Sequence, residues 1–189
     1  QCNAWCSPGI SIYPQDGRAV DTLLKNADAA MYRAKEGGRS NFQFYTSEMN
    51  ERVNERLALE NALRRALERN ELILHYQQKV SVNTGHIVGA EALVRWMHPE
   101  WGLVRPARFI PLAEETGLIV SIGEWVLREA CRQSRAWMDA GLQPGIVSVN
   151  LSVRQFRQEG LVRTVSRILE ETRLDPAQLE MELTESMVM

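Results

Sequence analysis

One strand sets the fold class of this chain: the sequence VSVNLS at residues 147–152 alternates apolar and polar side chains. Because successive side chains of a strand point to opposite faces, its polar residues share one face and its apolar residues share the other. The sequence LEMELT at residues 179–184 repeats this alternation. Between the two strands, Ser152 and Gln155 have the spacing of a helix N-terminus, and helical character continues to about residue 172. Strands that alternate with helices in this way predict the parallel sheet of an α/β domain.

The same alternation extends upstream, over residues 71–145. Two strands and two helices are expected there: strands over residues 72–82 and 87–96, and helices over residues 109–116 and 121–140. Ser121 and Glu124 form the capping box expected at the start of the second helix. A complete barrel of eight strand–helix units takes about 250 residues. Residues 71–189 provide fewer than half of that number, so we predict a partial, truncated (β/α) barrel.

Residues 1–70 have a different organisation. A strand over residues 9–14, a helix over residues 21–36 and a short strand over residues 42–45 predict a separate domain segment, residues 1–45. Residues 46–70 are rich in Glu, Arg and Leu and contain neither Gly nor Pro. This composition predicts a solvated helix that connects the first segment to the partial barrel at residues 71–189.

Composition narrows the functional classes. The chain has 189 residues, with 22 basic and 24 acidic side chains and a formal net charge of -2. This balance argues against a nucleic-acid binder or a membrane-surface binder, since both need a basic excess. No apolar run approaches the roughly 18 residues of a membrane span. Three cysteines cannot form a closed disulfide framework, which favours a reducing, cytoplasmic compartment.

The first residues suggest no chemistry of their own. Cys2 and Cys6 have a spacing that matches no common zinc ribbon, and no histidine lies near them, so we expect no metal site there. The start at Gln1 has neither an initiator Met nor the layout of a signal peptide, and we expect it to be a cut end.

Polar side chains gather on one face of three predicted strands. They are Glu91 and Arg95 on the first, Ser148, Asn150 and Ser152 on the second, and Glu180, Glu182 and Thr184 on the third. Helices pack against the outer face of barrel strands, so these polar side chains belong in the barrel interior or at its rim. Oxygen ligands from neighbouring strands favour a hard cation such as Mg²⁺ or Mn²⁺. A second interpretation stays open, in which some of them make ordinary hydrogen bonds at strand ends.

Five motifs occur in the order found in one protein family: LHYQ at residues 74–77, GAEALVRW at 89–96, FIPLAEETG at 109–117, VNLS at 149–152 and ELTE at 182–185. Together they make the region from about residue 71 onward similar to the EAL-domain family of cyclic di-GMP phosphodiesterases. The resemblance implies a modified, TIM-like (β/α) barrel, of which residues 71–189 form the N-terminal part. It also implies hydrolysis of cyclic di-GMP to linear pGpG in bacterial second-messenger signalling.

The resemblance implies a metal site. Glu91, Asn150 and Glu182 correspond to the family's ligands for Mg²⁺ or Mn²⁺, and Glu91 and Glu182 belong to its catalytic set. The family's remaining site residues, which include an Asp-Asp pair, are expected beyond Met189. We therefore expect this segment alone to be inactive, whatever the activity of its parent.

Three further residues have implied roles around the substrate. Arg95 resembles the residue that contacts the substrate phosphate, and Gln77 resembles a residue that touches the bound nucleotide. Glu185 resembles the family's glutamate that steadies a loop near the metal ions. Gln78 departs from the family, which usually has proline at this position, and the departure affects local stiffness rather than chemistry.

The first segment carries a second resemblance, on GISIYP at residues 9–14, ADAAMYRAK at 27–35 and GRSN at 38–41. It is similar to the C-terminal end of a GGDEF-type diguanylate cyclase domain, an α+β domain that is familiar in tandem before an EAL domain. The resemblance implies that Lys35 and Arg39 contact the phosphates of GTP. An alternative of equal weight is that these cations only complement the dipole at the end of a helix.

Three other functions stay open at this stage. In the first, the barrel is an inactive receptor that binds cyclic di-GMP and signals through the helix at residues 46–70. In the second, the parent protein acts mainly as a diguanylate cyclase. In the third, the helix at residues 46–70 is the interface of a homodimerisation module. The presence of Glu91, Asn150 and Glu182 favours the enzyme, because a pure binder needs fewer metal ligands.

Overall fold

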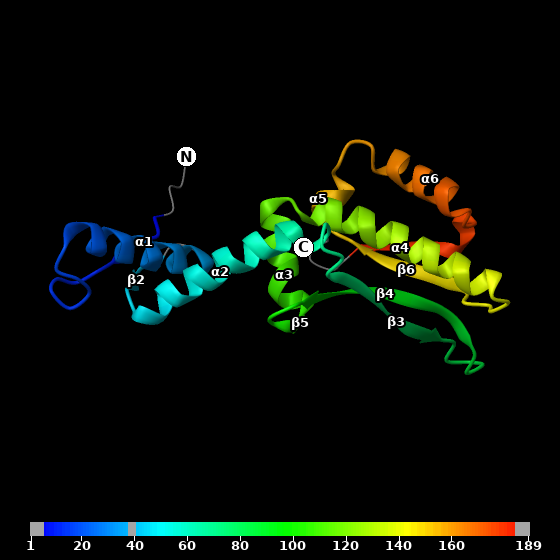
Figure 1. Ribbon diagram of the computed structural model, residues 1–189, viewed down its shortest axis with the longest axis horizontal. Coiled ribbons are helices and arrows are strands. Elements are labelled where there is room, and N and C mark those ends of the chain that lie inside the picture. Colours follow the sequence, from blue (N-terminus) through cyan, green and yellow to red (C-terminus); the bar gives the residue numbers. More distant parts are fainter. Residues whose placement is uncertain (1–5, 38–40, 184–189) are drawn as a thin grey trace. The chain divides into compact units, whose positions relative to one another are not determined.

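The computed structural model describes residues 6–37 and 41–183 of the chain. The chain divides into two compact units, residues 1–61 and residues 62–189. This division falls inside one helix, α2 (Ser47–Ala66), which largely confirms the helix expected in this region (Figure 1). The domain boundaries expected after residues 45 and 70 stay predictions. No helix in the described part of the chain has the length and apolarity that crossing a bilayer requires.

The first unit contains a two-stranded parallel sheet with a helix packed against it. Its elements are β1 (Gly9–Ile10), α1 (Val20–Glu36), β2 (Gln43–Phe44) and the first part of α2. A Cβ atom at Gly9 would lie 2.0 Å from the carbonyl oxygen of Ala27, so only glycine allows this approach of strand and helix. The expected order of strand, helix and strand is confirmed.

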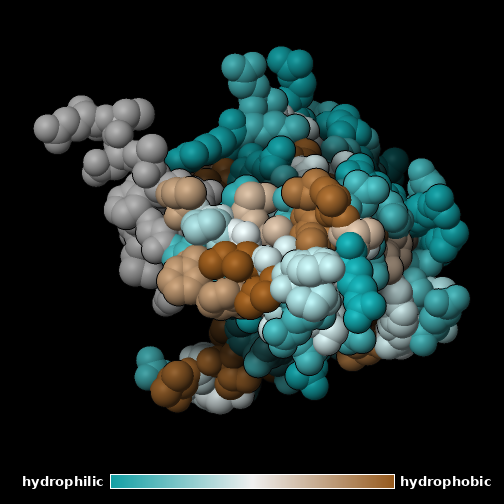
Figure 2. All heavy atoms as spheres, turned by 90° about the vertical axis from the view of Figure 1, so that its left-hand side faces the viewer, coloured by the Kyte–Doolittle hydropathy of each residue, from teal (hydrophilic) through white to brown (hydrophobic). Residues whose placement is uncertain are grey.

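The first unit also leaves large apolar side chains in contact with solvent. The most exposed of them are Tyr13, Val20, Leu24 and Phe42, which are 59–71% exposed. Figure 2, in which the elements at the left of Figure 1 face the viewer, shows apolar side chains gathered on this face. A surface of this composition is typical of a contact face.

The second unit is a mixed sheet with helices on one face (Figure 1). Its strands are β3 (Leu72–Val80), β4 (Ile87–His98), β5 (Gly102–Val104), β6 (Ile146–Leu151) and β7 (Leu179–Leu183). Its helices are α3 (Pro106–Thr116), α4 (Ile119–Asp139), α5 (Val153–Phe156), α6 (Leu161–Thr172) and a 3₁₀ turn, η1 (Pro176–Gln178). The strand order is β3-β4-β6-β7, and β5 pairs with β4.

The sheet is parallel where helices connect its strands. β4 pairs in parallel with β6, and β6 pairs in parallel with β7. β3 is instead antiparallel to β4, because only residues 81–86 join them and a parallel crossover needs a dozen residues or more. The partial α/β barrel predicted from the sequence is confirmed, with one antiparallel strand at its edge.

The core of this unit lies between the sheet and α4. The outward face of the strands is buried and apolar, with Ala92, Val147 and Val149 at 2–4% exposure. Ile122 and Ala130 are among the α4 residues that are buried as well. The period-two alternation therefore directs apolar side chains towards the helices and leaves the opposite face of the sheet to polar side chains.

One predicted helix start is wrong and another is confirmed. α4 begins at Ile119, because Gly117 ends α3 in the left-handed conformation and the chain turns directly into the next helix. Ser121 therefore lies inside the first turn and caps nothing. Ser152 does form the predicted capping box: its hydroxyl accepts from the Gln155 amide, and the Gln155 side chain accepts from the Ser152 amide at 3.2 Å.

Trp96 is the largest fully buried side chain among the described residues of the second unit, and it fixes the end of β4. Its indole Nε1 donates to Glu71 Oε2 at 2.9 Å, in a place where the carboxylate is itself buried. Its ring packs edge-to-face on Phe109 of α3, with 5.8 Å between the ring centroids. The aromatic contact therefore ties α3 to the strand that carries Glu91 and Arg95.

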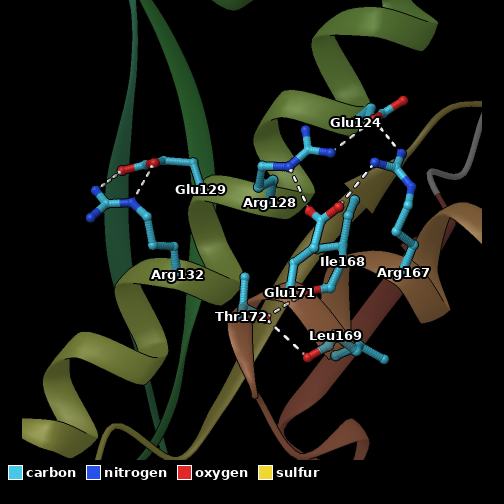
Figure 3. A network of polar contacts seen from close by, with 9 residues as sticks. All are labelled: Glu124, Arg128, Glu129, Arg132, Arg167, Ile168, Leu169, Glu171 and Thr172. Atoms are coloured by element: carbon cyan, nitrogen blue, oxygen red, sulfur yellow. Dashed lines mark hydrogen bonds and ion pairs between the residues drawn. The ribbon is translucent and has the colours of Figure 1, made fainter.

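Glu124 belongs to an ion-pair network that joins α4 to α6, shown in Figure 3. Its Oε1 accepts from Arg128 Nη2 at 3.0 Å and from Arg167 Nη2 at 2.7 Å. Glu171 pairs with the same two arginines at 3.2 and 3.1 Å. The guanidinium of Arg167, followed by that of Arg128, lowers the pKa of Glu124.

Glu124→Gln is expected to destabilise the second unit by about 1 kcal/mol or less at pH 7, because water screens a network of this exposure. A carboxylate whose pKa is lowered on folding stabilises the protein above its unfolded pKa of about 4.3 and loses that effect as pH falls. The difference between the two proteins should therefore begin to shrink as pH falls below about 4.3, disappear only below the lowered pKa of the folded state, and also shrink in high salt. Urea unfolding at several pH values measures it, with the exposed Glu159→Gln as control. A difference independent of both pH and salt would contradict the assignment.

Candidate active site

Polar side chains of four strands line the sheet face opposite α4. In the pairing register Gln77 lies beside Glu91, Glu91 beside Ser148, and Ser148 beside Glu180. In the next row of the same face, Asn150 lies beside Glu182. The sheet thus brings the three predicted metal ligands onto adjacent strands with one orientation, as the sequence predicts.

Glu91 and Asn150 are in direct contact. Asn150 Nδ2 donates to Glu91 Oε1 at 2.6 Å. In this arrangement the amide oxygen of Asn150 and the second carboxylate oxygen of Glu91 are available as ligands for a cation. Together with Glu182 they form a set of hard oxygen donors, the type that Mg²⁺ and Mn²⁺ prefer.

The acidic residues alone do not form a metal site. Within residues 6–37 and 41–183, no three His, Cys, Asp or Glu side chains come together as a group that could hold a metal ion. A cation at this position would therefore need the amide of Asn150 and at least one further ligand beside Glu91 and Glu182. The donor chemistry fits a divalent cation on these terms.

Sequence analysis missed Lys79, which the structure places among the acidic residues of this face. Its Nζ contacts Ser148 Oγ at 2.5 Å, Glu180 Oε2 at 2.8 Å and Glu182 Oε1. Hydrogen bonds to Glu180 and Glu182 raise the pKa of Lys79, and the bond from Lys79 lowers the pKa of Glu180. The period of two would have placed Lys79 on the same face as Gln77, so the signal was present in the sequence.

Arg95 lies further along β4, beside a cavity of about 300 Å³. Its Nη1 donates to the carbonyl oxygen of Val94 at 2.8 Å. Asn150 and Ser152 also line this cavity, whose other walls are mostly apolar side chains of α3 and α4. The cavity lies towards the carboxyl ends of β4 and β6, on the side of the sheet that α4 covers, because Ala92, Ile122 and Leu151 line it as well.

The other predicted site residues either do not lie on the polar face of the sheet or fall outside the described residues. Arg39 and Glu185 lie outside the described residues, as does Cys2. Lys35 is exposed in the last turn of α1, a position compatible both with a phosphate contact and with the helix dipole. Cys131 is fully buried, and burial raises the pKa of its thiol to about 11.

Comparison with known families identifies the two domains to which the chain is similar. Residues 60–189 match the EAL domain, and residues 2–41 match the diguanylate cyclase GGDEF domain. Since the first match covers more than half of the sequence, the chain belongs to the EAL-domain family. It carries a GGDEF tail before the EAL domain, as the sequence motifs predict.

Two relatives match nearly the whole of this chain. The chain is 52% identical over 183 residues to the bifunctional diguanylate cyclase/cyclic di-GMP phosphodiesterase MucR of Pseudomonas aeruginosa, covering 97% of this chain and 27% of MucR. It is 44% identical over 181 residues to the cyclic di-GMP phosphodiesterase PdeR of Escherichia coli, covering 96% of this chain and 27% of PdeR. The chain thus spans about a quarter of the length of these curated relatives.

Solved structures show the same fold. The PaMucR phosphodiesterase in complex with c-di-GMP matches with a TM-score of 0.67 and 53% identity, over 70% of this chain and 53% of that one. The cGMP-bound form of the EAL enzyme Bd1971 matches with a TM-score of 0.67 and 26% identity, over 92% of this chain and 45% of that one.

Proposed function

We propose that the full-length protein hydrolyses cyclic di-GMP to linear pGpG in a reaction that depends on Mg²⁺ or Mn²⁺. The observation that carries this proposal is the placement of Glu91, Asn150 and Glu182 on one face of adjacent strands, with Glu91 and Asn150 in contact. The phosphodiesterase activity named for MucR and PdeR supports the choice of substrate.

Each group on this face has a task in phosphodiester hydrolysis. The reaction needs an activated water, neutralisation of the phosphoryl charge and support for the leaving oxygen, and bound divalent cations supply these. Glu91, Asn150 and Glu182 hold and orient the cations through their oxygens. Asn150 also fixes the Glu91 carboxylate by its hydrogen bond, so the ligand is oriented before substrate arrives.

Arg95 and Gln77 contact the substrate in this proposal. The Arg95 guanidinium binds a non-bridging phosphate oxygen through charge-assisted hydrogen bonds, which a planar donor group makes well. Its present bond to a neutral carbonyl is weaker and is readily exchanged for a phosphate. Gln77 lies beside Glu91 in the register and reaches the same substrate from β3.

The remaining expectations about partners stay predictions. For the full-length protein we still predict a contact between GTP phosphates and the side chains of Lys35 and Arg39, a homodimer and a cytoplasmic location. The segment boundaries are predictions as well: the GGDEF segment at residues 1–45, the connecting helix at 46–70 and the EAL segment at 71–189.

Removal of the metal ion tests the proposed reaction in the full-length protein. After dialysis against EDTA, conversion of cyclic di-GMP to linear pGpG is expected to fall to background and to return on addition of Mg²⁺ or Mn²⁺. Chromatography of the nucleotides measures the product. Undiminished turnover in EDTA would contradict the proposal, and so would a product other than pGpG.

A further inference from the structure

The ammonium group of Lys79 has an acceptor for each of its N–H donors, and one of these acceptors is the proposed metal ligand Glu182. A lysine ammonium has three N–H donors, and the structure gives Lys79 three acceptors: Ser148 Oγ, Glu180 Oε2 and Glu182 Oε1. Ser148 is fully buried and also donates to Glu180 Oε2 at 2.6 Å. The position of the ammonium is therefore fixed by groups from two strands, β6 and β7.

A glycine on the intervening strand leaves the path to this position clear. Lys79 of β3 is paired with Gly89 of β4, so no side chain of β4 stands between Lys79 and β6 at this level. The strands are also close, because a Cβ atom at Gly89 would lie 2.3 Å from the carbonyl oxygen of Ile146. The Lys79 side chain can thus cross from β3 to carboxylates two strands beyond its neighbour.

We infer that Lys79 is a resident cation that competes with the divalent metal for Glu182. This inference rests on the proposed function, because it takes Glu182 to be a metal ligand. In the metal-free protein Lys79 holds Glu180 and Glu182 together and offsets one of their two negative charges. When a metal ion binds, it meets a Glu182 carboxylate that already has a positive partner, so the site fills only at a higher metal concentration.

Electrostatics predicts how Lys79 affects the stability of the metal-free protein and the affinity of the site for a divalent cation. Without Lys79, the carboxylates of Glu180 and Glu182 would stand two residues apart on one face of β7 with no cation between them, which destabilises the metal-free fold. A divalent cation would then gain one more unit of negative charge in its surroundings. Lys79 therefore stabilises the empty site and weakens metal binding at the same time.

Lys79→Met in the full-length protein tests the inference with two readouts that do not depend on turnover. In EDTA, the melting temperature of the domain that contains the second unit is expected to fall by on the order of 2–4 °C. In Mn²⁺ titrations followed by electron paramagnetic resonance, without substrate, the variant is expected to bind about tenfold more tightly than the parent. Lys25→Met, an exposed lysine on α1, is the matched control and should change neither value.

Two further variants keep the result interpretable. Lys79→Gln removes the charge with a smaller loss of hydrogen bonding, and it replaces Lys79→Met in both measurements if that variant fails to fold. Lys79→Arg keeps the charge, so its melting temperature and its Mn²⁺ affinity should stay close to those of the parent. Unchanged or weaker Mn²⁺ binding in the neutral variants would overturn the inference. Glu91→Gln in the same titration separates the two proposals: if it binds Mn²⁺ as the parent does, the proposed metal site is wrong. If Glu91→Gln loses Mn²⁺ while Lys79→Met equals the parent, only the role of Lys79 is wrong.

Discussion

Glu91→Gln in the full-length protein is expected to reduce the hydrolysis of cyclic di-GMP by about 1000-fold. A bound cation contributes several kcal/mol to a phosphoryl-transfer barrier, and each 1.4 kcal/mol corresponds to a factor of ten in rate. The substitution keeps the shape of the side chain and removes the charge that holds the cation. It also leaves Asn150 with a neutral acceptor in place of a carboxylate.

The measurement is the rate of pGpG formation at saturating cyclic di-GMP and Mg²⁺. Glu100→Gln is a suitable control, because Glu100 is an exposed glutamate just after the same strand and lies outside the polar face. Its rate should stay within about twofold of the parent. Retention of more than a tenth of the parental rate by Glu91→Gln would show that Glu91 is not a metal ligand.

Trp96→Ala is expected to destabilise the second unit by about 3–5 kcal/mol. The substitution removes a fully buried indole and its contact with Phe109. It also removes the donor to Glu71 and leaves a buried carboxylate with one partner fewer. Because α3 then loses its anchor on β4, the cavity wall beside Arg95 should loosen as well.

Urea unfolding followed by circular dichroism measures this loss. Trp96→Phe should cost less, about 1–3 kcal/mol, because it retains an aromatic ring and loses the hydrogen bond to Glu71. Trp101→Ala is the control, since Trp101 is 41% exposed and borders the same cluster. Equal destabilisation by Trp96→Ala and Trp101→Ala would refute the role given to the buried indole.

Alternation along the strands predicted most of the fold. The apolar residues at 147, 149 and 151 were expected to face helices, which placed Ser148 and Asn150 on the other face of the strand. The antiparallel pairing of β3 was not predicted, although the short turn at residues 81–86 leaves no room for a parallel crossover. The start of α4 could not be predicted in the same way, because the glycine at 117 ends one helix and leads directly into the next.

The polar face was predicted only in part. Alternation placed Glu91, Asn150 and Glu182 on one face together with other polar residues, and only the resemblance to the EAL-domain family singled these three out as metal ligands. Lys79 did not stand out, since a lysine near the end of a hairpin strand usually points to solvent. Its position depends on Gly89 and on the order of strands across the sheet, and a one-dimensional pattern does not reveal which strands are neighbours.

The direction of β3 determines at which end of the sheet the loop between β3 and β4 lies. Because β3 runs against its neighbours, the loop at residues 81–86 emerges at the amino ends of β4 and β6, the end remote from Arg95. Val82 at its tip is completely exposed. This loop is consequently the place where the chain can accept an epitope tag or a fluorescent reporter without obstructing the entry of a nucleotide.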